Sequence, residues 1–142
     1  MTPIIREAVA SDIPVLDAIE QESFALGPWD AGSFLKYSCF VAELEHRVAG
    51  FLVSREVFPG IQGARPEREI LNLAVAPVYR RLGIATALLR HELSLNATHY
   101  LDVRESNVGA RKLYEHLGFT EVGRRTDYYT CPIENAIVME MK

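Results

Sequence analysis

Residues 69–90, EILNLAVAPVYRRLGIATALLR, decide the expected fold. Six of the first eight residues are apolar, which is typical of a strand that is buried on both faces. Pro77 ends this strand, and a loop with two arginines and Gly83 leads into residues 86–89, which have the composition of a helix start. The stretch therefore predicts a strand, a basic loop that contains glycine, and a helix, in that order.

A loop of this kind is expected to bind a phosphate group. The first N–H groups of the helix lack partners within it, and the helix dipole adds about half a positive charge at the same end. Small residues at positions 83 and 85 allow a phosphate to approach the backbone. The stretch has neither the G-x-G-x-x-G pattern of dinucleotide folds nor the Gly-Lys-Ser/Thr end of nucleotide-triphosphate loops. An ordinary turn with solvated arginines is the alternative.

The bulk properties of the chain narrow the class of protein. Its 142 residues are the size of one domain, so we expect a single domain over residues 1–142. The net charge of −4 argues against a general nucleic-acid binder. The two cysteines and four histidines form no metal-ligand pattern, which predicts a reduced, metal-free, cytoplasmic protein. The N-terminus lacks the features of a secretory signal, and no apolar run approaches the ~18 residues of a membrane span.

Alternating apolar residues and turn signals outline the remaining elements. Strands are expected at residues 4–6, 39–45, 48–58, 69–76, 99–104, 119–129 and 135–141. One helix is expected after a cap at Ser11 or Asp12, a second after Asp30, and a third that follows the basic loop and runs to about Leu95. A fourth is expected from Ser106 or Asn107 to a left-handed stop at Gly118. The fourth and fifth strands should be parallel across a helical crossover. The predicted class is α/β (α+β), with a mixed, mostly antiparallel seven-stranded sheet and helices on both faces.

Two motifs carry a resemblance to a known family. The pattern Arg80-x-x-Gly83-x-Ala85 is similar to the acyl-coenzyme-A signature of the GCN5-related N-acetyltransferases (GNAT). Residues 101–119, LDVRESNVGARKLYEHLGF, resemble the second conserved block of the same family and are the more specific motif. The resemblance continues through residues 123–129 and 136–139 and covers nearly the whole chain. It is strongest to the RimI type, bacterial enzymes that acetylate the N-terminal alanine of a small-subunit ribosomal protein.

The resemblance implies a GNAT fold, acetyl-CoA as the cosubstrate, and particular residues that bind it. In that family the asparagine at position 107 contacts coenzyme A, and the tyrosine at position 114 reaches the thioester sulfur. The pyrophosphate or 3′-phosphate would lie on Arg80, Arg81, Leu82, Gly83, Ile84, Ala85 and Thr86. The backbone of Leu73, Ala74 and Val75 would contact the pantetheine arm where the fourth and fifth strands splay.

Acetyl transfer to an amine needs a base and an acid. An N-terminal amine has an unperturbed pKa of ~7.7–8.0, so a carboxylate can remove its proton directly or through a water. Asp102 is one candidate, although RimI-type enzymes have the longer glutamate there; Glu69 is the other, and the choice stays open. Either could instead be a structural carboxylate paired with Arg104 or Arg68. Tyr114 is expected to protonate the departing thiolate, with packing in the core as the alternative.

Aromatic residues are expected to line the acceptor groove. Trp29, Tyr128 and Tyr129 combine apolar rings with polar tips, which suits a partly wet peptide surface. For Trp29, packing between the two N-terminal helices is an equal alternative. The predicted function is acetyl transfer from acetyl-CoA to a primary amine, the N-terminal amine of a protein first of all, with a ribosomal protein as a partner. Transfer to a small amine (a polyamine, an aminoglycoside or an amino acid) and a non-catalytic acyl-CoA-binding module are the alternatives.

Overall fold

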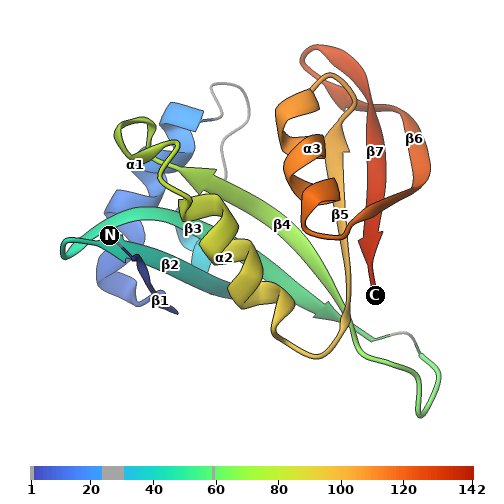
Figure 1. Cartoon of the computed structure of the whole chain (residues 1–142), viewed down its shortest axis with the longest axis horizontal. Helices are drawn as coiled ribbons and strands as arrows, with labels where there is room; N and C mark the ends of the chain where they lie inside the picture. Colours follow the sequence, from blue (N-terminus) through green and yellow to red (C-terminus); the bar gives the residue numbers. More distant parts are fainter. Residues whose placement is uncertain (1, 24–30, 59) are drawn as a thin grey trace. The chain divides into compact units, whose positions relative to one another are not determined.

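The structure, a computed structural model, describes residues 2–23, 31–58 and 60–142 (Figure 1). Its strands are hydrogen-bonded in the order β1-β2-β3-β4-β5-β7-β6, which confirms the predicted seven-stranded mixed sheet. The strands are β1 (Ile4–Glu7), β2 (Ser38–Leu44), β3 (Arg47–Val57), β4 (Glu67–Val75), β5 (Thr98–Arg104), β6 (Thr120–Thr130) and β7 (Ile133–Met141). The helices are α1 (Ile13–Ser23), α2 (Ile84–Leu93) and α3 (Val108–His116), with 3-10 helices at Ala10–Asp12, Ala31–Leu35 and Pro77–Tyr79.

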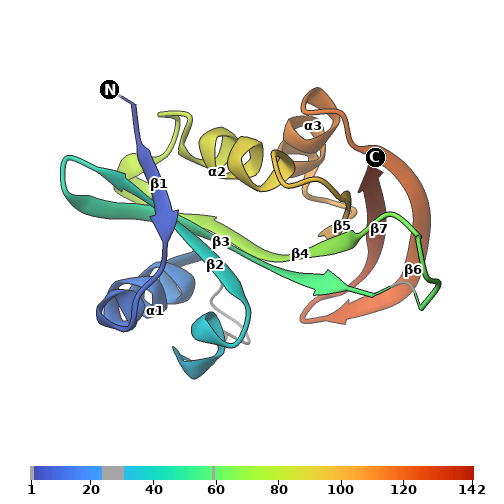
Figure 2. The ribbon, with the colours of Figure 1, turned by 90° about the horizontal axis from the view of Figure 1, so that it is seen from below.

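The chain divides into two compact units, and β4 contributes residues to both. The first unit consists of Met1–Arg55 and Leu71–Leu95. In it, α1 and α2 cover opposite faces of β2 and β3 (Figure 2). Its apolar core comprises Leu16, Ile19, Phe34, Cys39, Val41, Phe51, Val53, Ala74 and Ala76. The T-shaped contact of Phe34 and Phe51, with ring centroids 5.1 Å apart, fixes the short helix after residue 30 against the sheet.

The second unit consists of Glu56–Ile70 and Asn96–Lys142. Here β5 runs parallel to the start of β4, and β6 pairs antiparallel with β7, as the sequence predicts. Strand β5 also pairs antiparallel with β7. Helix α3 covers one face of β5 and β7 (Figures 1 and 2). Gly118, which follows α3, adopts the expected left-handed conformation with φ of 108°. A Cβ at Gly118 would lie 3.3 Å from the Met141 side chain, so α3 packs on the face that Met141 occupies.

Several local predictions differ from the structure. The element expected after Asp30 is a 3-10 helix, Ala31–Leu35, and Asp30 itself lies outside the described residues. A one-turn 3-10 helix, Pro77–Tyr79, interrupts the connection that was expected to be a plain loop. The turn between β2 and β3 falls at Glu45 and His46, both with positive φ, instead of one residue later. Strand β4 is buried on one face and half-buried on the other, so burial on both faces was wrong.

The predicted cap at the first helix is part of an ion-pair network. The Asp12 carboxylate accepts a hydrogen bond from the Val9 N–H at 2.8 Å and two from the Arg6 guanidinium at 2.8 and 2.9 Å. Arg6 also donates to Glu43 on β2 at 2.7 Å. The hydrogen bonds from Arg6 are the main cause that lowers the pKa of Asp12, and the Val9 N–H contributes. This network joins β1, the start of α1 and β2.

Candidate active site

The loop before α2 has the backbone expected of a phosphate site. Gly83 is the residue before α2 and has φ of 78°, and Arg81 is also left-handed with φ of 64°. A Cβ built on Gly83 meets no protein atom within 4 Å, so packing does not require glycine; the backbone angle does. Among the described residues, the space beside Gly83 is therefore open to a ligand group. The residues predicted to hold the coenzyme phosphates fit that group.

The two arginines of this loop differ in their surroundings. Both are exposed, and the Nε of Arg80 donates to the backbone oxygen of Val75 at 3.3 Å. This bond holds the stem of Arg80 against the end of β4. The predicted pantetheine residues Leu73, Ala74 and Val75 lie on the same strand, beyond the part that pairs with β5, which runs from Glu67 opposite Thr98 to Ile70 opposite Leu101.

Asn107 and Tyr114 both belong to α3 and its cap. The Oδ1 of Asn107 accepts a hydrogen bond from the Ala110 N–H at 3.2 Å, so Asn107 is the cap that the sequence left open between two residues. Because this side-chain oxygen bonds to the helix, the two N–H groups on Nδ2 are the side-chain donors left for a ligand. Tyr114 is half-buried and its ring contacts Phe119 in a T-shaped arrangement at 5.7 Å. Burial raises the pKa of Tyr114 to about 12, which keeps the hydroxyl protonated near neutral pH.

The two candidate bases lie on one face of the second unit. Glu69 is the register partner of Tyr100, and Asp102 follows Tyr100 by two residues, so strand alternation directs all three side chains to the same side. The opposite face of β5 carries His99, which is the register partner of Met141 and so belongs to the side that α3 covers. Tyr114 and the carboxylates therefore approach β5 from opposite faces.

Asp102 is paired, but with an arginine that the sequence did not single out. The Nε of Arg125 on β6 lies 3.3 Å from Oδ1 of Asp102. Arg104, a partner considered in the structural alternative, pairs with Glu134 at 3.2 Å. Arg68 lies 3.6 Å from Glu56. Arg125 was missed because its contact with Asp102 depends on strand order, although its position within the family-like stretch was visible.

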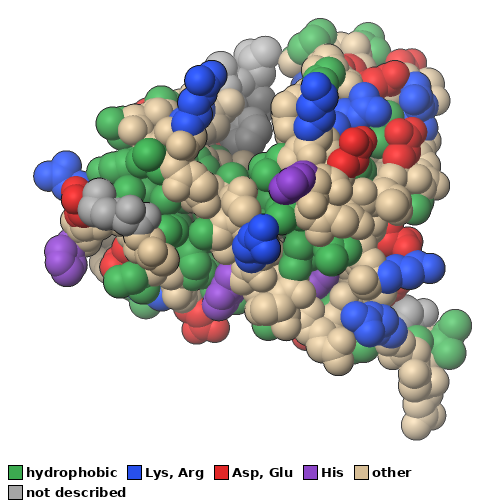
Figure 3. Space-filling model, in the orientation of Figure 1, with side chains coloured by type: hydrophobic (Ala, Val, Ile, Leu, Met, Phe, Trp, Pro, Cys, Tyr) green, Lys and Arg blue, Asp and Glu red, His purple; other side chains and the backbone are tan. Residues whose placement is uncertain are grey.

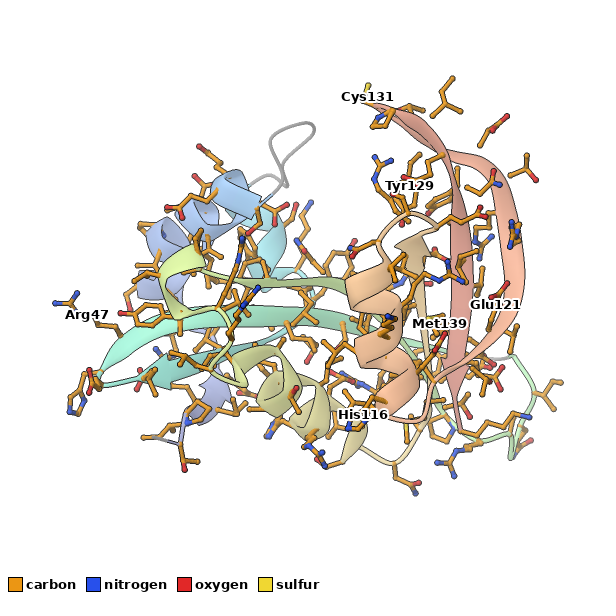
Figure 4. All side chains as sticks on the ribbon, turned by 45° about the horizontal axis from the view of Figure 1, so that its top comes forward. Arg47, His116, Glu121, Tyr129, Cys131 and Met139 are labelled. Carbon is orange, nitrogen blue, oxygen red and sulfur yellow. The ribbon has the colours of Figure 1, made fainter. Side chains whose placement is uncertain are left out.

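Tyr128 and Tyr129 form an aromatic rim beside Asp102. Their rings meet in a T-shape at 5.2 Å, the guanidinium of Arg104 lies 4.3 Å above the Tyr129 ring, and that of Arg125 lies 5.7 Å from the Tyr128 ring. Burial is the main cause that raises the pKa of Tyr129 to about 12; the Asp102 charge adds to it, and Arg104 opposes it. Figure 4 shows Tyr129 near the hairpin end of β6 and β7 where Cys131 lies, away from Glu121 and Met139.

The second unit thus brings together most of the predicted chemistry. Tyr129 interacts electrostatically with both Asp102 and Tyr114, which links the two sides of β5. Glu69 and Asn107 belong to the same unit. The loop predicted to bind phosphate belongs to the first unit, and Trp29 lies outside the described residues.

Other candidate sites in the described residues carry none of these groups. A cavity of about 380 Å³ lies at the connection of β3 and β4, and Glu56, Phe58, Ile61 and Glu67 are among the residues that line it. It contains no predicted site residue. No group of three or more His, Cys, Asp or Glu side chains in the described ranges is placed to hold a metal ion. Over the same ranges, no helix has the length and apolar character to cross a membrane.

Comparisons with known proteins identify the family of this chain. Residues 11–119 match the model of the acetyltransferase (GNAT) family. The chain is 36% identical to the [ribosomal protein bS18]-alanine N-acetyltransferase of Escherichia coli K12, over 96% of this chain and 95% of that protein. The crystal structure of the E. coli ribosomal-protein-S18-alanine N-acetyltransferase superposes with a TM-score of 0.82 at 33% identity, covering 99% of this chain and 93% of the other.

A second solved structure shows a similar likeness. Ard1 from Thermoplasma volcanium superposes with a TM-score of 0.85 at 28% identity, covering 99% of this chain and 97% of that one. The family match covers most of the sequence, and the E. coli relative is matched over nearly its full length. The chain therefore belongs to the GNAT family of acetyl-CoA-dependent N-acetyltransferases.

Proposed function

We propose that this enzyme acetylates the N-terminal α-amine of a protein, with a ribosomal protein as the first substrate to test. The observation that carries the proposal is the arrangement on the second unit, where Asp102 lies beside the rim formed by Tyr128 and Tyr129. Tyr128 is 52% exposed, so the rim is accessible from solvent. An accessible aromatic surface suits an extended peptide, whereas a closed acidic pocket would suit a polyamine. The activity named for the E. coli relative supports the same acceptor.

The proposed chemistry removes two protons from the acceptor nitrogen and adds one to the departing sulfur. Asp102 or Glu69 takes a proton from the ammonium group, directly or through one water, and leaves a neutral amine. The amine nitrogen then forms a bond to the acetyl carbonyl carbon and loses its second proton to solvent, and the bond from that carbon to sulfur breaks. Tyr114 supplies the proton that the thiolate gains, and solvent returns a proton to the tyrosine. The products are the acetylated amine and free coenzyme A.

The coenzyme would be held by the residues that the two family-like motifs predict. Arg80, Arg81 and the N–H groups at the start of α2 would contact its phosphates, and Asn107 would donate through its amide nitrogen. The acyl chain would then end near Tyr114. We propose these residue roles together with a single catalytic domain over residues 1–142.

A panel of matched acceptors tests the proposal. One peptide has a free N-terminal alanine and no lysine; its control differs from it by an acetylated N-terminus and one internal lysine. Small amines, including a polyamine, form the third group. We expect acetylation of the first peptide alone, measured by mass spectrometry and by release of the coenzyme A thiol. Transfer confined to the lysine peptide or to small amines would refute the N-terminal acceptor, and no transfer to any amine would favour a non-catalytic binding module.

A further inference from the structure

Strand β6 has an irregularity directly before the tyrosine rim. Arg125 is opposite Ala136 and Tyr129 is opposite Glu134, so residues 126–128 of β6 face the single residue Asn135 of β7. Asp127, in the middle of this bulge, has φ of 51°. A residue with a Cβ is disfavoured in that left-handed region, although aspartate tolerates it better than most. The bulge therefore needs a contact elsewhere that stabilises it.

Asn135 provides that contact through its side chain. Its Oδ1 accepts a hydrogen bond from the Asp127 N–H at 2.9 Å, in place of the regular ladder bond that the bulge removes. Its Nδ2 donates to Oε2 of Glu105 at 3.1 Å, and Oε1 of Glu105 accepts from Arg124 at 2.8 Å. The backbone oxygen of Asn135 also accepts from the Glu105 N–H at 3.1 Å. One half-buried side chain thus connects the β6 bulge to the segment between β5 and α3.

Both ends of this connection lie next to proposed site residues. Asp127 directly precedes Tyr128 and Tyr129, so its backbone angles set the direction of both rings. Glu105 lies between Asp102 on β5 and Asn107, the cap of α3. Ion pairs of Arg124 with Glu105 and Glu121 hold the outer side of β6, and acidic and basic side chains intermingle on the visible surface of α3 and β6 (Figure 3). Ion pairs therefore surround the bulge, and its central N–H, that of Asp127, donates its hydrogen bond to Asn135.

We propose that Asn135 is a positioning residue for the acceptor. By accepting a hydrogen bond from the Asp127 N–H, it stabilises the left-handed bulge. The bulge in turn orients Tyr128 and Tyr129 toward the acceptor amine, whose proton Asp102 is proposed to take. The role rests on the proposed function, because the rim is taken to bind the acceptor peptide. Acetyl-CoA binding should be largely independent of it, since Asn135 touches the β5–α3 segment through Glu105 and not through Asn107.

Three variants and one control test this role. Asn135→Ala removes both side-chain hydrogen bonds. Asn135→Asp keeps an acceptor for the Asp127 N–H but loses the donor to Glu105. Asn135→Ala combined with Asp127→Gly lets a residue without Cβ adopt the left-handed angle unaided. The control, Asn96→Ala, makes the same change at an exposed asparagine outside the site.

For Asn135→Ala we expect the KM of the alanine peptide to rise about tenfold, the ratio that corresponds to one lost hydrogen bond. The kcat and the KM of acetyl-CoA should stay within about twofold, because the acid and the coenzyme contacts are unchanged. The glycine double variant should recover most of the peptide KM. Exchange of the Asp127 amide proton, followed by NMR, should accelerate in Asn135→Ala and stay slow in Asn135→Asp.

The outcomes separate this role from the proposed function. A wild-type chain that acetylates no peptide refutes the acceptor and this role with it. An active wild type whose Asn135→Ala variant keeps its peptide KM, while Asp127 exchange accelerates, overturns the role of Asn135 alone. A lower kcat, raised KM values for both substrates and lower thermal stability, none of which Asp127→Gly relieves, would also overturn this role. That result would show that Asn135 is a purely structural residue.

Discussion

Replacing Tyr114 with phenylalanine isolates the proposed acid of the reaction. The change removes one hydroxyl group and keeps the ring that contacts Phe119. Because the pKa of Tyr114 is about 12, the wild-type hydroxyl is protonated throughout a normal assay range and is always able to donate. Loss of a general acid costs about 10²–10⁴-fold in rate, which is about 2.7–5.4 kcal/mol of transition-state stabilisation.

The assay measures kcat with the alanine peptide, acetyl-CoA affinity by calorimetry, and the melting temperature. We expect kcat to fall at least 10²-fold while affinity and stability change little. Tyr100→Phe is a matched control, because burial and a hydrogen bond to Glu67 at 2.9 Å raise the pKa of that tyrosine to about 12 as well. The control should lose about 1 kcal/mol of stability and keep its kcat.

The pH dependence provides a second readout. A tyrosine whose pKa is raised from 10 to about 12 remains protonated up to that pH. Its titration should therefore cause no fall in kcat at pH values under about 10. A kcat for Tyr114→Phe within about threefold of wild type would refute the acid role and return Tyr114 to the apolar packing of α3.

Three further predictions concern the bases, the phosphate loop and the fold. If Asp102 is the base, Asp102→Asn should lower kcat and remove the acidic limb of its pH profile while Glu69→Gln has a modest effect; the reverse pattern would identify Glu69, and two unchanged profiles would indicate deprotonation by solvent. Gly83→Val should abolish the thermal stabilisation by acetyl-CoA, which is about 2.7 kcal/mol at a hundredfold excess over Kd. The reason is that valine is disfavoured at φ of 78° and obstructs the phosphate. An undiminished shift of the melting temperature would contradict this placement of the phosphate. The lowered pKa of Asp12 stabilises the fold at pH values above its unfolded value of 3.8, and the contribution is lost as pH falls through the folded-state pKa. Asp12→Asn should therefore cost about 2 kcal/mol at pH 7 and progressively less as the pH is lowered through that range, measured by urea unfolding.

The local sequence determined the elements and the motifs. Strand alternation, the asparagine before α3 and the glycine after it predict these elements because their signals lie within a few residues of one another. The loop pattern around Gly83 and the block that contains Tyr114 indicate the family, since both concern short continuous segments. The 3-10 turn at Pro77–Tyr79 escaped prediction because its short-range signals are weak.

Only the tertiary structure decided which charged groups meet. Asp102 pairs with Arg125, 23 positions away, although Arg104 is much nearer in the sequence. The strand order β5-β7-β6 brings these two side chains together, and local spacing does not encode that order. The same holds for Asn135, which the sequence places at the start of the last strand and which in the fold bonds to Asp127 and Glu105. Strand register sets these contacts, and a shift of one residue would direct every side chain to the opposite face.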